Sequence, residues 1–294
     1  MTVSPFLAGR DRYERSTVGR VDSVDDEAFA HTVRLVDDDF AVEMRAECTP
    51  SPGYEVRAAR AWIAAGEDPP VDVAEVGQLA GMRMVSGFTR RLAELTGDRP
   101  AASRVVDAGV EIARLARQVT RVPASEVADA RAGDARRFWA LDMKGWVDLP
   151  GSCFTYSPAG RALLETRPVT TPMAPEMYCS PPGARAIFRR RRLARLVLTG
   201  RRLHLFAALH DNVHGFDIHY ELDLDGGVIV AADSITSRLP YMGICTEPQG
   251  RIEALVGQPV DAALRKRIQG LVGGEGGCAQ LYDLTADLLK LLSL

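Results

Sequence analysis

The sequence lacks both a long apolar run and a surplus of either charge. No stretch of roughly 18 apolar residues is present, and no charged segment followed by an apolar one indicates export. A formal net charge of -3 argues against the basic face that nucleic acid requires. We therefore expect a cytoplasmic protein that binds neither nucleic acid nor a membrane, and the sequence leaves its oligomeric state open.

Cysteine and lysine are also scarce. The five cysteines are scattered singly, and without an export signal we expect free thiols rather than disulfides. Lysine occurs only at positions 144, 266 and 290, so the basic charge is almost entirely arginine. A hydrophobic content of 46% with 26% charged residues is typical of a folded globular chain, and 294 residues suffice for two domains of ordinary size.

The first part of the chain changes its apolar period from two to about 3.6. Alternating segments separated by acidic or Pro-Gly turns predict four strands, over 17–24, 28–35, 40–48 and 54–63. Helical periodicity then predicts three helices over 73–79, 85–95 and 101–119, with Gly81 and Gly97 as C-terminal stops. Residues 12–130 are therefore expected to form one α+β unit.

The same order of elements returns in the last third. Strands are predicted over 193–199, 203–210, 216–224 and 228–234, and helices over 249–255, 262–271 and 278–292. A shift of 176 positions superposes Leu79 on Leu255 and Asp107 on Asp283 without a gap. We interpret this as a tandem duplication. The expected fold class is α+β, with residues 188–294 as the second unit, each unit an antiparallel sheet of about four strands packed with about three helices.

Residues 131–187 connect the two units and are rich in proline and aromatic residues. The aromatic side chains include Trp139, Trp146, Tyr156 and Tyr178. A long ordered connection of this kind covers something, either the groove between two domains or a ligand site. We therefore name these four residues as candidate contacts to a small-molecule ligand and leave open whether the connection is a lid or packing.

The second unit contains motifs that resemble an uncharacterised bacterial family catalogued as DUF2889. The motifs are Pro240-Tyr-Met-Gly-Ile-Cys245, Leu255-Val-Gly257 and Gly277-Cys278-Ala-Gln-Leu-Tyr-Asp-Leu284. The layout is also similar, as an analogy of fold, to iron–sulfur scaffold domains of the NifU/IscU type. The resemblance implies a Cys/His set that would bind zinc or iron. This chain departs from the pattern, because Phe216 and Gln280 stand where the family has histidines.

Cys245 and Cys278 remain the best candidates for a metal site or a nucleophile. A cysteine at a helix N-terminus tends toward the thiolate, which suits either role. The alternative is that both thiols simply fill the core, because unpaired cysteine is among the most buried residue types.

A second candidate site lies on the predicted strand over 216–224. Alternation places Asp217, His219 and Glu221 opposite its apolar face. If the connection covers that side, His219 with Glu221 makes an acid–base pair, and Asp217 stands beside them. If it does not, the three are an ordinary solvated strand face.

A run of arginines precedes the first strand of the second unit. Arg192 belongs to it and is a candidate for binding a phosphate, although such runs are more often solvated or paired with acidic residues.

We thus predict an enzyme that performs acid–base chemistry, such as a cyclase or isomerase of specialised metabolism, on an organic or thioester-linked substrate. The expected pocket lies between the two units, and no cofactor is required. The alternatives are a zinc- or iron-binding accessory protein that uses Cys245 and Cys278, and an interaction module without catalysis.

Overall fold

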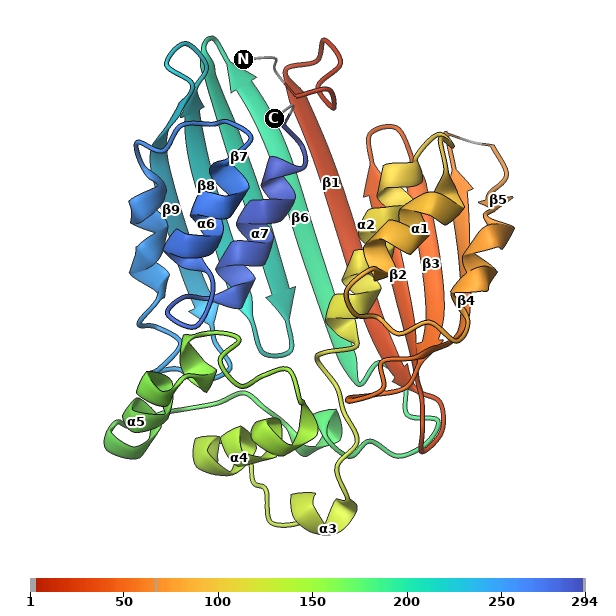
Figure 1. The fold of residues 1–294 in the computed structure, drawn as a ribbon, viewed down its shortest axis with the longest axis vertical. Helices are drawn as coiled ribbons and strands as arrows, with labels where there is room; N and C mark the ends of the chain where they lie inside the picture. The colour runs from red at the N-terminus through yellow and green to blue at the C-terminus, as the bar shows by residue number, and fades with distance from the viewer. Residues whose placement is uncertain (1–3, 67, 293–294) are drawn as a thin grey trace.

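The computed structural model describes residues 4–66 and 68–292, so the last two residues of the predicted second unit lie outside it. Its centre is one antiparallel sheet of nine strands in the order β5-β4-β3-β2-β1-β6-β7-β8-β9 (Figure 1). The strands are β1 (Arg12–Ser23), β2 (Phe29–Asp37), β3 (Ala41–Cys48), β4 (Val56–Ala64), β5 (Val71–Asp72), β6 (Phe188–Thr199), β7 (Arg202–Asp211), β8 (Gly215–Asp223) and β9 (Val228–Arg238).

Four of the α-helices pack on one face of this sheet (Figure 1). They are α1 (Phe88–Thr96), α2 (Ala102–Leu115), α6 (Leu264–Val272) and α7 (Ala279–Leu289), and the 3-10 helices η1 (Ala74–Leu79) and η4 (Gln249–Leu255) precede each pair. Strand β8 shows why the helices pack on this face. Its even-numbered residues from Phe216 to Leu222 are buried beneath the helices, while the odd-numbered ones from Asp217 point to the other face and are not buried.

The two predicted units share one sheet. Strands β1 and β6 pair antiparallel over ten residues, from Arg12 opposite Val197 to Val21 opposite Phe188. Each is the first strand of its half, so each would otherwise expose a long unpaired edge. The α+β class is confirmed, but the prediction of a separate four-stranded sheet in each unit is wrong, because this pairing merges them and β5 adds a short ninth strand.

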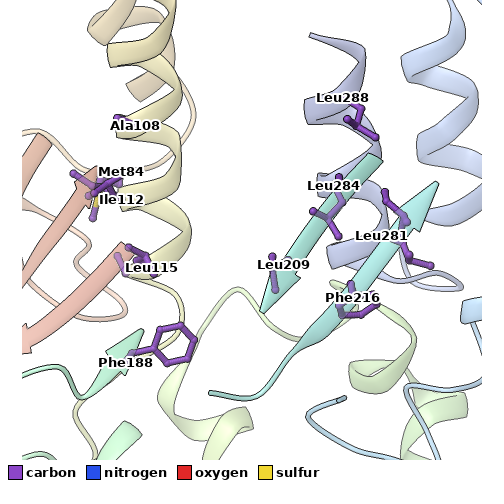
Figure 2. Close-up of a cluster of buried hydrophobic side chains, with 14 of the residues drawn as sticks. Met84, Ala108, Ile112, Leu115, Phe188, Leu209, Phe216, Leu281, Leu284 and Leu288 are labelled. Atoms are coloured by element: carbon purple, nitrogen blue, oxygen red, sulfur yellow. The ribbon is translucent and has the colours of Figure 1, made fainter. Parts of the chain in front are cut away.

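The helices bury apolar stripes against the strands. Figure 2 shows Ala108, Ile112 and Leu115 of α2 facing one half of the sheet, and Leu284 and Leu288 of α7 facing the other. All five side chains are buried. Each fully buried leucine stabilises the fold by about 1.5–3 kcal/mol relative to an exposed one.

The connection forms helices at one end of the sheet rather than a cover over its open face (Figure 1). They are α3 (Ala124–Val127), just before the predicted connection, then α4 (Ala135–Gly145) and α5 (Pro158–Thr166), with the 3-10 turns η2 (Phe154–Tyr156) and η3 (Pro175–Met177). Among the described residues, no helix combines the length and apolar character that crossing a membrane requires.

Charged residues join α2 and α7 across the β1–β6 junction, and they range from the buried Glu111 through the half-buried Arg192 and Asp287 to the exposed Lys290. Glu111 of α2 lies 2.7 Å from Arg192, which also lies 2.6 Å from Asp287 of α7. Arg114 pairs with Asp283 at 3.0 Å, and Lys290 pairs with Asp107 at 3.0 Å. Buried ions are tolerated only when they are paired, so these contacts fix how the two helices sit on the shared sheet.

Burial would raise the pKa of Glu111, but the positive charges of Arg192, Arg190 and Arg114 outweigh it and hold that pKa below its ordinary value. The carboxylate is therefore ionised at neutral pH, and it shares the compensation of Arg190 with Asp211 and that of Arg192 with Asp287.

We expect Glu111→Gln to lower the free energy of unfolding by about 2 kcal/mol, because it removes one of the two carboxylates that compensate each of the guanidinium groups of Arg190 and Arg192. Urea unfolding at pH 7 measures the change. Glu94→Gln, which removes a carboxylate from exposed pairs with Arg90 and Arg91, is the control and should cost less than about 0.5 kcal/mol. Equal losses in the two variants would contradict a structural role for the network.

Candidate functional site

A cavity of about 140 Å³ lies where the connection meets the second half of the chain. Its walls come from α4 and the segment after it, the β7–β8 turn, the turn after β9, the start of α7 and the C-terminal end of α2. A smaller cavity of about 50 Å³ lies beside the α2–α7 ion pairs, where Glu111, Arg114 and Asp287 already compensate one another. Wider hollows of about 470 and 510 Å³ lie between α2 and α7 and beside β3 and β4. The cavity of about 140 Å³ is the candidate site because a buried carboxyl group, a histidine and three thiols line it.

A buried carboxyl group forms part of the cavity wall. Asp142 of α4 is 1% exposed and accepts hydrogen bonds from three tyrosine hydroxyls, those of Tyr156 at 2.7 Å, Tyr178 and Tyr241. Burial raises the pKa of Asp142 to about 6, and the three hydrogen bonds oppose that shift. Because Tyr241 follows β9 while the other residues belong to the connection, this cluster fastens the connection to the second half.

A histidine oriented by a carboxylate also lines the cavity. Asp211 ends β7, and its carboxylate accepts the backbone N–H groups of Val213 at 2.8 Å and His214 at 2.6 Å, which closes the turn into β8. The same carboxylate lies 3.1 Å from His214 Nδ1 and accepts Nε–H of Arg190 at 2.8 Å.

Burial would raise the pKa of Asp211, but His214 and Arg190 lower it well below its ordinary value. Asp211 is therefore ionised, and it holds the Nδ1 side of the imidazole. Nε2 is the ring nitrogen left for a ligand, which is the arrangement of a general base held by an orienting group.

Three thiols lie in the cavity wall. Cys245 follows β9, Cys278 precedes α7, and Cys153 comes from the connection. Cys245 Sγ lies 2.8 Å from Thr155 Oγ1. Burial raises the pKa of Cys245 to about 12 and that of Cys278 to about 11, so both are protonated at neutral pH.

The structure thus brings Cys245 and Cys278 to one cavity, although burial outweighs the thiolate character expected at a helix N-terminus. Within residues 4–66 and 68–292, no group of three or more His, Cys, Asp or Glu side chains is arranged to hold a metal ion.

One residue that lines the cavity carries a buried polar group without a partner. Trp146 is 3% exposed, and within the described part of the chain its indole Nε1–H finds no acceptor. An unpaired buried N–H costs about 1–3 kcal/mol, so the group is suited to a ligand that supplies an acceptor.

The predicted residues on β8 lie on the other face of the sheet. His219 Nε2 lies 3.3 Å from His204 Nδ1, and Glu221 lies 3.5 Å from Arg202. Asp217 lies 3.2 Å from His210. The condition for their catalytic role was that the connection covers this face, whereas the connection lies at the end of the sheet (Figure 1).

The predicted ligand contacts divide into two groups. Trp146 and Tyr156 line the cavity, and Tyr178 lies behind them, with its hydroxyl on Asp142 and its ring 5.5 Å from that of Trp146. Trp139 donates to the carbonyl of Thr155 at 3.2 Å, and Arg192 belongs to the ion pairs beneath α2 and α7, so neither lines the cavity.

Sequence reasoning did not name Asp142, Asp211, His214 or Tyr241 as candidate site residues. Tyr241 stands inside the quoted Pro240–Cys245 motif, and Asp211 precedes His214 by three residues in a turn. These two positions were the available signals. An aspartate at the start of such a turn can accept hydrogen bonds from the backbone N–H groups two or three residues later. Asp142 carries no local signal of a site.

Residues 200–292 match the model of a family described as a protein of unknown function (DUF2889). The matched segment contains His214, Tyr241, Cys245 and Cys278, and it agrees with the resemblance drawn from the motifs. No curated protein and no solved structure matches the chain. The comparisons therefore give no support to the tandem duplication or to the likeness with iron–sulfur scaffold domains.

The raised pKa of Asp142 predicts a stability that depends on pH. The carboxyl group deprotonates near pH 4 in the unfolded chain and near pH 6 in the folded one, so its contribution is full below pH 4 and lost above pH 6. Between pH 4 and pH 7, the free energy of unfolding of the wild type should fall by about 3 kcal/mol more than that of Asp142→Asn. Urea unfolding across this range measures both.

Asp129→Asn, at an exposed position before α4, is the control and should follow the wild type. Parallel curves of stability against pH for the wild type and Asp142→Asn would refute the raised pKa of Asp142.

Proposed function

We propose that this protein is an enzyme that performs acid–base chemistry on a small organic molecule held in the cavity beneath the connection. The observation that carries the proposal is the His214–Asp211 pair, whose imidazole lines the cavity while its Nδ1 is held by an ionised carboxylate. The sequence predicted the class of reaction. The proposal places the catalytic histidine in the β7–β8 turn, whereas the sequence predicted it on β8.

In this proposal, His214 moves the proton at Nε2. With Nδ1–H donated to Asp211, the neutral ring presents the Nε2 lone pair to the cavity and takes a proton from the substrate there. The imidazolium that results is stabilised by Asp211, which Arg190 and two backbone N–H groups keep ionised. The same nitrogen then returns the proton to a different atom of the substrate.

Such a cycle suits an isomerase or a cyclase, because both reactions proceed by proton transfers without a net change in oxidation state. The lining contributes apolar walls from Met173, Val213, Phe216 and Leu239, which lower the polarity around the reacting atoms. For a thioester-linked substrate, only the acyl part fits a cavity of about 140 Å³.

We also infer that the two halves arose by duplication of one α+β unit, residues 12–130 and 188–294. Two features support this. Apart from the two-residue strand β5 and the short helix α3 of the first half, both halves run through four strands, a 3-10 helix and two α-helices in the same order. The Asp107–Lys290 and Arg114–Asp283 contacts are reciprocal, as expected about a twofold axis.

The test is His214→Gln. Incubation of the purified protein with a metabolite extract, followed by mass spectrometry of the mixture, identifies the compounds that the wild type converts. We expect His214→Gln to slow this conversion by about 10²–10⁴-fold, the range of general acid–base catalysis.

His210→Gln is the matched control, because His210 also pairs with an aspartate but lies exposed on the open strand face. It should convert the same compounds at the wild-type rate. Conversion that survives in His214→Gln would overturn the role of His214. A wild type that converts nothing would favour the interaction module, and stoichiometric zinc or iron lost in Cys245→Ser would favour the accessory protein.

A further inference from the structure

We propose that the ligand of this cavity is an uncharged molecule with an apolar body and a hydrogen-bond-accepting oxygen, as in a ketone or an ester. This inference rests on the proposed function, since it concerns the same cavity, and it adds the chemical class of the substrate. The charged groups in the wall already have hydrogen-bond or ion-pair partners within the protein, which leaves only neutral groups for a ligand.

The cavity offers no free positive charge to an anionic ligand. Arg117 is the only arginine or lysine in the described wall, and its guanidinium donates to Asp148 at 2.9 Å and to the carbonyls of Ala113 at 2.8 Å and Met84 at 2.9 Å. It also lies over the ring of Tyr54, at 4.5 Å from the centroid. A carboxylate or phosphate would therefore be buried without a counter-ion, which is costly.

The cavity offers no free negative charge to a cationic ligand either. Both oxygens of Asp142 already accept tyrosine hydroxyls, two on Oδ2 and one on Oδ1. The carboxylate of Asp211 is occupied by His214, Arg190 and two backbone amides, and it does not belong to the wall. An ammonium group would thus lose its water without gaining an unshared carboxylate.

The groups that remain for a ligand are neutral. The indole N–H of Trp146 is a donor only, so its partner must be an acceptor such as a carbonyl or ether oxygen. His214 Nε2 is the second group, and the half-buried amide of Gln280 is a third. Most of the other lining is apolar or consists of protonated thiols.

The volume restricts the size of the ligand. The cavity of about 140 Å³ is close to the engineered apolar cavity of about 150 Å³ that admits benzene. A single six-membered ring with a short oxygen-bearing substituent is therefore a suitable probe.

The experiment compares four probes that share one ring: acetophenone, benzoate, benzylammonium and ethylbenzene. Their dissociation constants are measured on the full chain at pH 7 by ligand-observed NMR titration. We expect acetophenone to bind at least about tenfold more tightly than either charged probe, because neither charge finds a partner in the wall.

Trp146→Phe tests the acceptor. It should weaken acetophenone binding by about tenfold, the equivalent of one hydrogen bond, and leave ethylbenzene unchanged. Equal weakening of both probes would show that the indole only shapes the cavity and would overturn the acceptor assignment. The comparison of the four probes on the wild type remains valid even if this variant folds poorly.

The failures are distinguishable. If benzoate or benzylammonium binds as tightly as acetophenone, the ligand class is wrong while the cavity remains a binding site and the proposed function stands. If none of the four probes binds to the wild type, both the ligand class and the use of this cavity are wrong.

Discussion

The pairing of β1 with β6 is the contact on which the rest of the structure depends. Ten residue pairs join the two halves into one sheet, and this places α2 beside α7 on the same face. Their charged residues then meet across the junction, where Glu111, Arg192 and Asp287 compensate one another away from water. The junction is therefore a continuous hydrogen-bonded ladder with a paired ionic layer above it, and a groove of about 470 Å³ between α2 and α7 lies on that layer.

The candidate cavity lies at the end of the sheet, away from this junction. There the β7–β8 turn, the turn after β9 and the start of α7 come together, and the connection closes over them. Asp142 fixes that closure, because its three tyrosine partners come from the connection and from the turn after β9. The apolar character of the wall and the orientation of His214 both follow from this arrangement.

Much of the fold was readable from local patterns. The alternation of β8 and the stop at Gly81 before the next helix depend on neighbours in sequence, and the structure agrees with both. Helix α4 was missed although Asp134 caps it through the N–H of Arg137, a signal that a search for caps would have found. The β1–β6 pairing was not readable, because both strands show the same alternation whether they are edges or neighbours. Likewise, nothing near Asp142 in sequence indicates Tyr241, which lies 99 positions away.

The continuous sheet also restricts how the molecule can move. In many two-domain enzymes, substrates enter when the domains swing apart about a flexible hinge. Here such a swing would break the ten β1–β6 pairs and separate the buried ions above them, so the two halves behave as one rigid body. The cavity is not sealed from solvent, so a ligand enters and leaves it without a swing of one half against the other.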